Sequence, residues 1–443
     1  MNRGVSMKLV KRITLLLVVL CFMITACKKT GEIESSLKSD NASETGAFSG
    51  ESVSSFVCYW NAHNIVFSSD YCLYHNDHGR LQIFDTNSKK DLIYCFDVGC
   101  EHKQTKRSMT GEVLEQGCIA YEISAKSVLM KDDKLYFLNA SGELCVSDRQ
   151  GANRRVIGHL PDYMNYVNIS DLFYSGDKMF AIYYLPYELI EIKDNDGSSH
   201  WISGEKKEKD VRGMFSMDLS DGKYTEFFNA ENYGSYLCQY DVRGDHVYFA
   251  YWYCDIPYMG ITGDTFGLVI PEELIELSVE EYRDEMHKRT WLDIFDYNYK
   301  TGELNTCIKH MNIPEGNIVF CRDFFALSYD KIAKTVLYRY NGESFNELDY
   351  SIYSSAWSDE HLFCSKRESN AQASSIYMLV DEANGETIRT TSEPIPNTIM
   401  PIVVYGKSVY CNMNLTGDWC KGYIPLEDFW NGDISNAVQL NCS

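Results

Sequence analysis

The sequence is poor in proline and poor in basic side chains relative to acidic ones. Only 9 of its 443 residues are proline, so little of the chain is barred from regular hydrogen-bonded structure. Its 41 basic side chains stand against 63 acidic ones, a net charge of −22. Such an acidic surface repels the phosphates of nucleic acids and of anionic lipid headgroups. We therefore expect no nucleic-acid partner, and any membrane attachment must have another source.

Motifs that carry common catalytic or nucleotide-binding chemistry are also missing. The chain has no Gly-x-Ser-x-Gly, no His-Glu-x-x-His and no phosphate-binding glycine loop. Carboxylates are plentiful, but no spacing singles out an acid/base pair. These absences favour a binding or scaffold protein over an enzyme, and they leave catalysis open.

One apolar run stands apart, at the N-terminus. It extends from Ile13 to Ile24 and follows four basic residues, Arg3, Lys8, Lys11 and Arg12. About 12 residues rise about 18 Å as a helix, which is too short for a hydrocarbon core of about 30 Å. A short apolar run behind basic residues and before small ones is typical of a secretory signal. We predict an export signal over residues 1–26.

The end of this run, Ile24-Thr25-Ala26-Cys27, resembles the lipobox of bacterial prolipoproteins. In that family the cysteine is lipidated and the peptide is cut before it. The resemblance implies lipidation of Cys27 and a lipid anchor at the extracytoplasmic face of the cell membrane. Residues 27–55 are rich in small and polar side chains, so we expect a flexible tether there. The alternative is a plain cysteine beside an ordinary cleavage site.

The remaining residues, 56–443, are expected to form a single all-β domain. Aromatic residues make up 14% of the chain, with 32 tyrosines, and such residues favour strands. An aromatic-rich strand recurs seven times, each time followed by an alternating strand that ends near a turn; the first strands lie at 71–74, 135–138, 179–182, 247–250, 324–327, 362–364 and 409–411. Short alternating strands at such spacings are typical of the blades of a β-propeller. Seven blades fit best, although six or eight also fit; a β-sandwich or two smaller β domains are the alternatives.

Two insertions interrupt this rhythm. Residues 271–290 are rich in glutamate and carry apolar residues at helical spacing, which predicts a helix on the rim. Residues 187–212 predict a long hairpin or loop. At the start of the domain, residues 56–70 are expected to help close the ring against the last blade.

Three cysteines and a histidine form the most specific cluster. Cys95, Cys100, His102 and Cys118 have the spacing Cys-x4-Cys-x-His, followed by fifteen residues and a cysteine. Three thiols and an imidazole can make a closed tetrahedral zinc site with a structural role. Two other interpretations stay open: a disulfide between Cys100 and Cys118 with spare thiols, or buried thiols without further chemistry.

This element resembles one near the first blade of a group of uncharacterised bacterial surface lipoproteins with a β-propeller body. Members often have Pro-Asp between the first two cysteines, where this chain has Val98-Gly99. They also have a shorter gap before the last cysteine, so 103–117 looks like an insertion here. The resemblance implies a fold and a location, and it implies no activity.

The remaining candidates have competing structural interpretations. Trp252, Tyr253, Trp291 and Trp357 are possible platforms for sugars or peptides, or blade packing. The segments His75–His78 and Asp194–Gly197 could hold metals, but turns are favoured. A pair between Cys411 and Cys420 is possible, while Cys72, Cys364 and Cys411 occupy a slot that phenylalanine fills in other repeats and are expected in the core.

We therefore expect a membrane-anchored extracytoplasmic lipoprotein. Its propeller would act as a binding or scaffold module for a glycan, a peptide or a protein. The alternative is a glycan-active hydrolase or lyase on the same scaffold, since fold alone does not decide between them.

Overall fold

The computed structural model describes residues 66–440, and its short gaps are at 68–70, 76–79, 86–89, 96–98, 104–105, 108–112, 116, 140, 149–152, 165, 194–198, 258–269, 313–315, 322–323, 330–333, 349–350, 359–360, 368–373, 382–385 and 406. The predicted signal, Cys27 and the tether lie outside these residues. Within them, no helix is both long enough and apolar enough to cross a bilayer.

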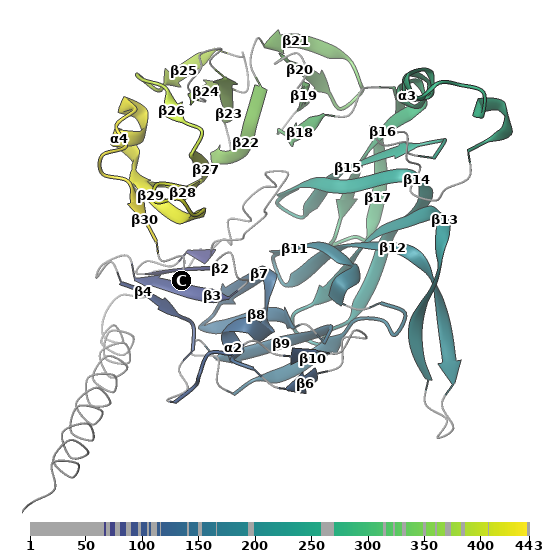
Figure 1. Cartoon of the computed structure of the whole chain (residues 1–443), viewed down its shortest axis with the longest axis horizontal. Coiled ribbons are helices and arrows are strands. Elements are labelled where there is room, and N and C mark those ends of the chain that lie inside the picture. The colour runs from purple at the N-terminus through teal and green to yellow at the C-terminus, as the bar shows by residue number, and fades with distance from the viewer. Residues whose placement is uncertain are drawn as a thin grey trace, which may run out of the picture.

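The described strands form antiparallel sheets arranged around a ring, and the first strand of each sheet lies nearest the centre (Figure 1). This is the β-propeller predicted from the alternating repeats. We divide the described strands into seven blades and number them in chain order; the seven-stranded sheet β11–β17 is divided within β14, and the other blades correspond to separate sheets.

The strands of the first four blades are β1 Val66–Phe67, β2 Tyr71–His75, β3 Leu81–Asp85 and β4 Lys90–Ile93; β7 Ile123–Lys131, β8 Lys134–Asn139, β9 Glu143–Asp148 and β10 Arg155–His159; β11 Ile169–Ser175, β12 Lys178–Lys193, β13 Ser199–Asp218 and the first half of β14 Tyr224–Arg243; and the second half of β14, β15 His246–Cys254, β16 Thr290–Asn298 and β17 Glu303–Met311. Those of the last three are β18 Asn317–Phe320, β19 Phe324–Tyr329, β20 Lys334–Arg339 and β21 Ser344–Leu348; β22 Ser351–Ser358, β23 His361–Arg367, β24 Ser374–Asp381 and β25 Thr387–Thr390, with β26 Ile395–Pro396 beside β24; and β27 Ile399–Tyr405, β28 Ser408–Met413, β29 Cys420–Pro425 and β30 Val438–Gln439. The elements outside the blades are β5 Lys106–Arg107, β6 Val113–Glu115, α2 Ile119–Glu122, η1 Tyr166–Asn168, η2 Glu272–Leu274, α3 Val279–Lys288 and α4 Leu426–Asn431.

Strand β14 belongs to two blades. Its residues Tyr224–Asn232 pair with β13, and Tyr233–Arg243 pair with β15. One continuous strand of 20 residues is therefore the last strand of blade 3 and the first of blade 4.

Apolar side chains fill the space between every pair of neighbouring blades. Each of seven core clusters joins one blade to the next, and one of these joins the last blade to the first. That closing cluster contains Tyr74 and Phe84 from blade 1 with Tyr410, Tyr423 and Leu440 from blade 7. Strand β1 pairs with β2 of its own blade, so the described part of 56–70 closes no sheet of the last blade. Among the described residues, side-chain packing joins the last blade to the first, and residues 56–65, on which the rest of this prediction falls, lie outside them.

The predicted repeats coincide with the second and third strands of the blades. The aromatic slot in the second strand is fully buried at Phe137, Phe180 and Phe325, and the thiols of Cys364 and Cys411 are equally buried. The core prediction is therefore confirmed for these two cysteines. The side chain of Cys72 lies outside the described set.

Both predicted insertions are confirmed. Strands β12 and β13 extend beyond the blade as a long hairpin that pairs up to Lys193 and Ser199, and α3 lies between β15 and β16 at the outside of the ring (Figure 1). The α3 helix begins at a capping box, in which Ser278 accepts a hydrogen bond from the backbone of Glu281 and the Glu281 carboxylate accepts one from the backbone of Ser278.

The long connections share one face of the ring. Strands in a blade alternate in direction, so the connection from second to third strand and the link to the next blade start at the same face. The extended hairpin and the rim insertion are of the first kind, and the link from β4 to β7, with the Cys/His cluster, is of the second. We call this the elaborated face. The opposite face is formed mainly by tight turns, many of which use positive φ, as at Gly176, Gly244 and Gly302.

Candidate metal centre

The cluster lies in the link between blades 1 and 2. Cys95 follows the last strand of blade 1, and Cys118 directly precedes α2, which leads into the first strand of blade 2. Between Cys95 and Cys100 the chain turns at Gly99, whose φ of 94° is a conformation that favours glycine. The residues that the spacing singled out thus come from both ends of the link.

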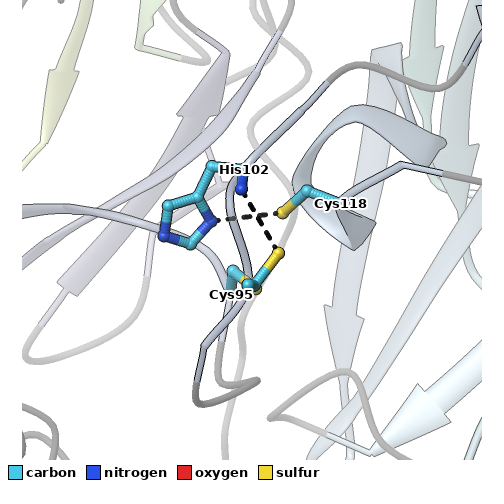
Figure 2. Close-up of side chains that lie close together, drawn as sticks. Cys95, His102 and Cys118 are labelled. Carbon is cyan, nitrogen blue, oxygen red and sulfur yellow. Dashed lines mark hydrogen bonds between the residues drawn. The ribbon is translucent and has the colours of Figure 1, made fainter.

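The structure brings all four ligand atoms together. One atom each from Cys95, Cys100, His102 and Cys118 lies within 4.8 Å of every other. The Sγ atom of Cys118 is 3.5 Å from Nδ1 of His102 (Figure 2). Metal–sulfur bonds of about 2.3 Å and metal–nitrogen bonds of about 2.1 Å, at tetrahedral angles, place sulfur and nitrogen about 3.6 Å apart. The observed separation would fit two ligands on one tetrahedral ion, and it is also the length of a thiol–imidazole hydrogen bond.

A backbone N–H group also points at a sulfur atom of the cluster. The N–H of His102 donates a hydrogen bond to Cys100 Sγ at 3.4 Å (Figure 2). His102 has φ of 52°, in the left-handed region that is costly for a residue with a side chain. This backbone conformation places both the N–H and the ring of His102 beside sulfur atoms.

None of the three cysteines is disulfide-bonded in the structure, so it does not contain the alternative bond between Cys100 and Cys118. Cys118 is buried, while Cys95, Cys100 and His102 are half-buried. Burial raises the pKa of the Cys118 thiol to about 12, and the neighbouring Cys95 and Cys100 also raise this pKa. A positive charge at the centre would favour the thiolate form instead.

Both flanks of the cluster are fixed by the core between blades 1 and 2. Tyr94, one residue before Cys95, is 1% exposed and packs in that core, as does the half-buried Ile119 that follows Cys118. The N–H of Cys118 donates a 2.8 Å hydrogen bond to the carbonyl of Lys103. Between these two residues β5 and β6 pair as a small hairpin, so the predicted loop over 103–117 contains a hairpin that is closed at its base.

The four ligand types define what the centre can do. Three thiolates and an imidazole suit Zn²⁺, and with four protein ligands a tetrahedral ion has no position left for water. An ion held by all four residues would therefore have a structural role and not a hydrolytic one.

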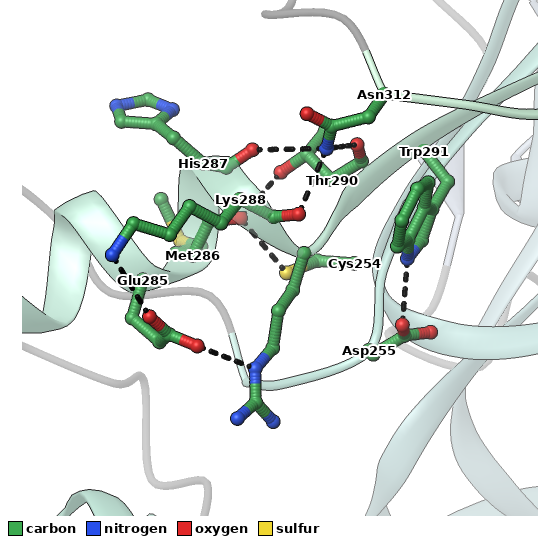
Figure 3. Close-up of polar contacts among 10 residues, drawn as sticks. Cys254, Asp255, Glu285, Met286, His287, Lys288, Thr290, Trp291 and Asn312 are labelled. Carbon is green, nitrogen blue, oxygen red and sulfur yellow. Dashed lines mark hydrogen bonds and ion pairs between the residues drawn. The ribbon is translucent and has the colours of Figure 1, made fainter.

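Of the four aromatic residues considered as ligand platforms, those described differ in how deeply they are buried. Trp252 is 3% exposed in the core between blades 4 and 5, and Tyr253 is 6% exposed between blades 3 and 4. Both rings therefore serve blade packing, because neither offers a face to a ligand. Trp291 is half-buried and its Nε1 donates a 2.6 Å hydrogen bond to Asp255 (Figure 3). The side chain of Trp357 lies outside the described set.

Sequence reasoning missed the polar contacts under the rim insertion. His310 lies edge-on to the rings of both Tyr253 and Trp291, and its backbone N–H donates to the Asp293 carboxylate at 2.7 Å. Burial raises the pKa of Asp293. Nothing in the spacing of these residues signals the contact, because they come from three strands whose register only the folded blade fixes.

The other cysteine and metal candidates form no further site among the described residues. Cys420 is disulfide-bonded, but Cys411 is a free buried thiol, so the possible Cys411–Cys420 pair is not formed and Cys411 lies in the core as expected. On the paired strands β28 and β29 the two cysteines are two register positions apart, since Cys411 pairs with Gly422 and Cys420 with Met413. Of the segment His75–His78, only His75 is described, at the end of β2, and Asp194–Gly197 lies outside the described residues.

No protein-family model matches the sequence, and a search of curated proteins gives no match. Among solved structures, the chain is similar to BamB from Moraxella catarrhalis, with 12% identity, a TM-score of 0.34 and coverage of 79% of this chain and 90% of that one. An oligogalacturonate lyase in complex with manganese has 11% identity, a TM-score of 0.43 and coverage of 82% and 87%. A puromycin hydrolase has 10% identity, a TM-score of 0.47 and coverage of 85% and 52%. Likenesses this distant carry no argument about what this chain does.

Proposed function

We propose that the chain is a lipid-anchored extracytoplasmic protein whose propeller is a binding or scaffold module that engages its partner through the elaborated face. The observation that carries the proposal is the asymmetry of the ring. In the described residues, the extended β12–β13 hairpin, the rim insertion and the long link after blade 1 all begin at this face. Loops held by a rigid scaffold are the usual place of recognition sites.

The location rests on the N-terminal pattern and on one further observation. The lipobox-like ending at Cys27 and the polar tether behind it supply an anchor and a spacer. The disulfide at Cys420 agrees with an oxidising compartment, because thiols are kept reduced in the cytosol.

The pKa shifts of the described carboxyl groups favour a binding protein over a glycan hydrolase. A glycosidase needs two carboxyls whose surroundings push their pKa values apart. Among the described carboxyls with a resolved shift, Asp293 is the one with a raised pKa, and its oxygen accepts a backbone hydrogen bond from His310. The others, such as Asp177 beside Lys131, have lowered pKa values and lie at the surface. No facing pair emerges from this part of the chain.

Site-specific photo-crosslinking on intact cells tests the proposed face. A photoreactive residue at Ile275, which is 61% exposed on the rim insertion, should capture a partner. The matched position is Ile388, which is 51% exposed on β25, the outer strand of blade 6, and should capture none. Equal capture at both positions would remove the argument for this face.

A second variant tests whether the extended β12–β13 hairpin takes part in binding the partner. Leu185 faces Val211 across the two strands, so residues 186–210 can be replaced by Asn-Gly, which suits a two-residue hairpin turn. The shortened protein should fold and should lose crosslinking at Ile275 if the hairpin belongs to the same surface. A glycan array with a parallel assay for released reducing ends addresses the alternative. Turnover by the wild type would replace the binding proposal with an enzyme.

A further inference from the structure

We propose that Cys95, Cys100, His102 and Cys118 bind one Zn²⁺ ion, and that this ion clamps the base of the β5–β6 hairpin to the junction of blades 1 and 2. The four ligand atoms lie within 4.8 Å of one another, and the measured edge of 3.5 Å between Cys118 Sγ and His102 Nδ1 fits a tetrahedron around zinc. The proposal does not depend on where the protein resides.

The donor set selects the class of metal. No carboxylate belongs to the cluster, whereas Mg²⁺ and Ca²⁺ are held by oxygen ligands. Three sulfurs and one nitrogen are the ligands of structural zinc sites of the Cys₃His type. The ring reaches the cluster through Nδ1, which leaves Nε2 as the N–H that faces away.

The backbone provides a second, independent observation. His102 has a left-handed φ of 52°, a conformation that costs free energy for a residue with a side chain. It directs the His102 N–H onto Cys100 Sγ, and backbone N–H groups that point at sulfur stabilise a thiolate. A metal-bound thiolate is the species that such a donor suits.

The consequence of the clamp is mechanical. Cys95, Cys100 and His102 lie on the chain leaving blade 1, and Cys118 lies on the chain that returns, so one ion joins both strands at the base of the hairpin. Beside it, the backbone bond from Cys118 to Lys103 closes the same base. With Tyr94 and Ile119 held in the core on either side, the ion ties a projection of the elaborated face to two blades at once.

Metal analysis of the full-length chain, extracted in detergent and purified without chelators, tests the proposal. We expect one zinc per chain in the wild type and none in Cys95→Ser, Cys118→Ser or His102→Ala. The matched control is Cys307→Ser, a half-buried free thiol on β17 outside the cluster, which should keep its zinc. Wild-type protein that stays metal-free after reduction and addition of Zn²⁺ would overturn the proposal, as would a Cys100–Cys118 disulfide found by peptide mass spectrometry.

Two further readouts keep the test independent of whether single variants fold. Replacement of zinc by Co²⁺ in the wild type should give sulfur-to-cobalt charge-transfer absorption, and His102→Cys should retain the metal while its spectrum moves to that of four thiolates. Chelation of the wild type should speed amide exchange at β5, β6 and Cys118 and leave β8 and β9 protected. A Co²⁺ spectrum that is identical in wild type and His102→Ala would remove His102 from the site.

Discussion

The ring of Phe84 in β3 lies against the ring of Tyr423 in β29, with 5.6 Å between their centroids, and this contact joins the first blade to the last. The two residues are far apart in the chain, and the strands that carry them belong to different sheets. Because no described strand of one end completes a sheet of the other, contacts of this kind hold the ring closed.

Phe84→Ala should therefore destabilise the whole ring. The side chain is 1% exposed in the closing cluster, and removal of a buried phenylalanine costs about 3–5 kcal/mol. The control is Phe345→Ala, whose ring is 39% exposed and packs edge-on against Phe324, with an expected loss of about 1 kcal/mol. Urea unfolding measures the free energy of unfolding of both variants. Equal losses of stability would mean that the closing cluster contributes no more than a surface contact.

A pair of glycines separates backbone strain from close packing. Gly222 and Gly302 both have positive φ, of 72° and 77°, so alanine at either should cost about 1–2 kcal/mol for the conformation alone. At Gly222 a Cβ would also lie 1.9 Å from the carbonyl oxygen of Ile157 in β10, whereas at Gly302 it would meet nothing within 4 Å. Gly222→Ala should be the clearly less stable variant by thermal unfolding. The reverse order would contradict the close approach of blades 2 and 3.

Asn312 should hold the end of the rim helix in place. Its Nδ2 donates to the carbonyl oxygens of Lys288 at 2.8 Å and Thr290 at 3.0 Å, just beyond α3 (Figure 3). Asn312→Ala removes these bonds, at about 1–3 kcal/mol locally, and Asn312→Asp adds repulsion between its carboxylate and the same carbonyls. Amide exchange in α3 should rise for Ala and rise further for Asp. A protein in which Asp behaves as the wild type would show that the amide donates nothing there.

Anchoring through Cys27 is tested by metabolic labelling with a fatty acid. The wild type should be labelled and should partition with membranes, while Cys27→Ala should be unlabelled and should lose membrane attachment, because the rest of the chain is strongly acidic. Cys58→Ala is the matched cysteine control and should label as the wild type does. Equal labelling of Cys27→Ala would show that the lipobox interpretation is wrong.

Much of the architecture could be predicted because local sequence patterns determine the strands and the rim helix. The slot filled by Phe137 and Phe180, and by the thiols of Cys364 and Cys411, marks the second strand of a blade at each repeat. The helix at 279–288 was visible from its period and its glutamates. The convergence of Cys95, Cys100, His102 and Cys118 is what one of the three interpretations of their spacing requires, and three of the four lie within eight residues.

The rest depends on contacts between distant residues, which no local pattern reports. The sequence left two interpretations of Trp252 open because large aromatic rings serve both recognition and packing, and its 3% exposure decides for packing. The capping of α3 by Asn312 and the edge-on contact of His310 with Trp291 arise from strand register. The packing that joins the last described blade to the first is likewise a property of the assembled blades.

The shared strand β14 joins two blades without a loop between them. Its first half carries Phe228 in blade 3 and its second half carries Tyr240 in blade 4, and both side chains are buried in the core cluster between these blades. The register of the second half shifts between Tyr233 and Tyr236 and again between Leu237 and Gln239, so each half keeps its own alignment with its partner strand. Blades 3 and 4 are therefore expected to gain and lose their structure as one cooperative unit, because they share a strand and a core, and a duplication or deletion that separated them would have to cut within that strand.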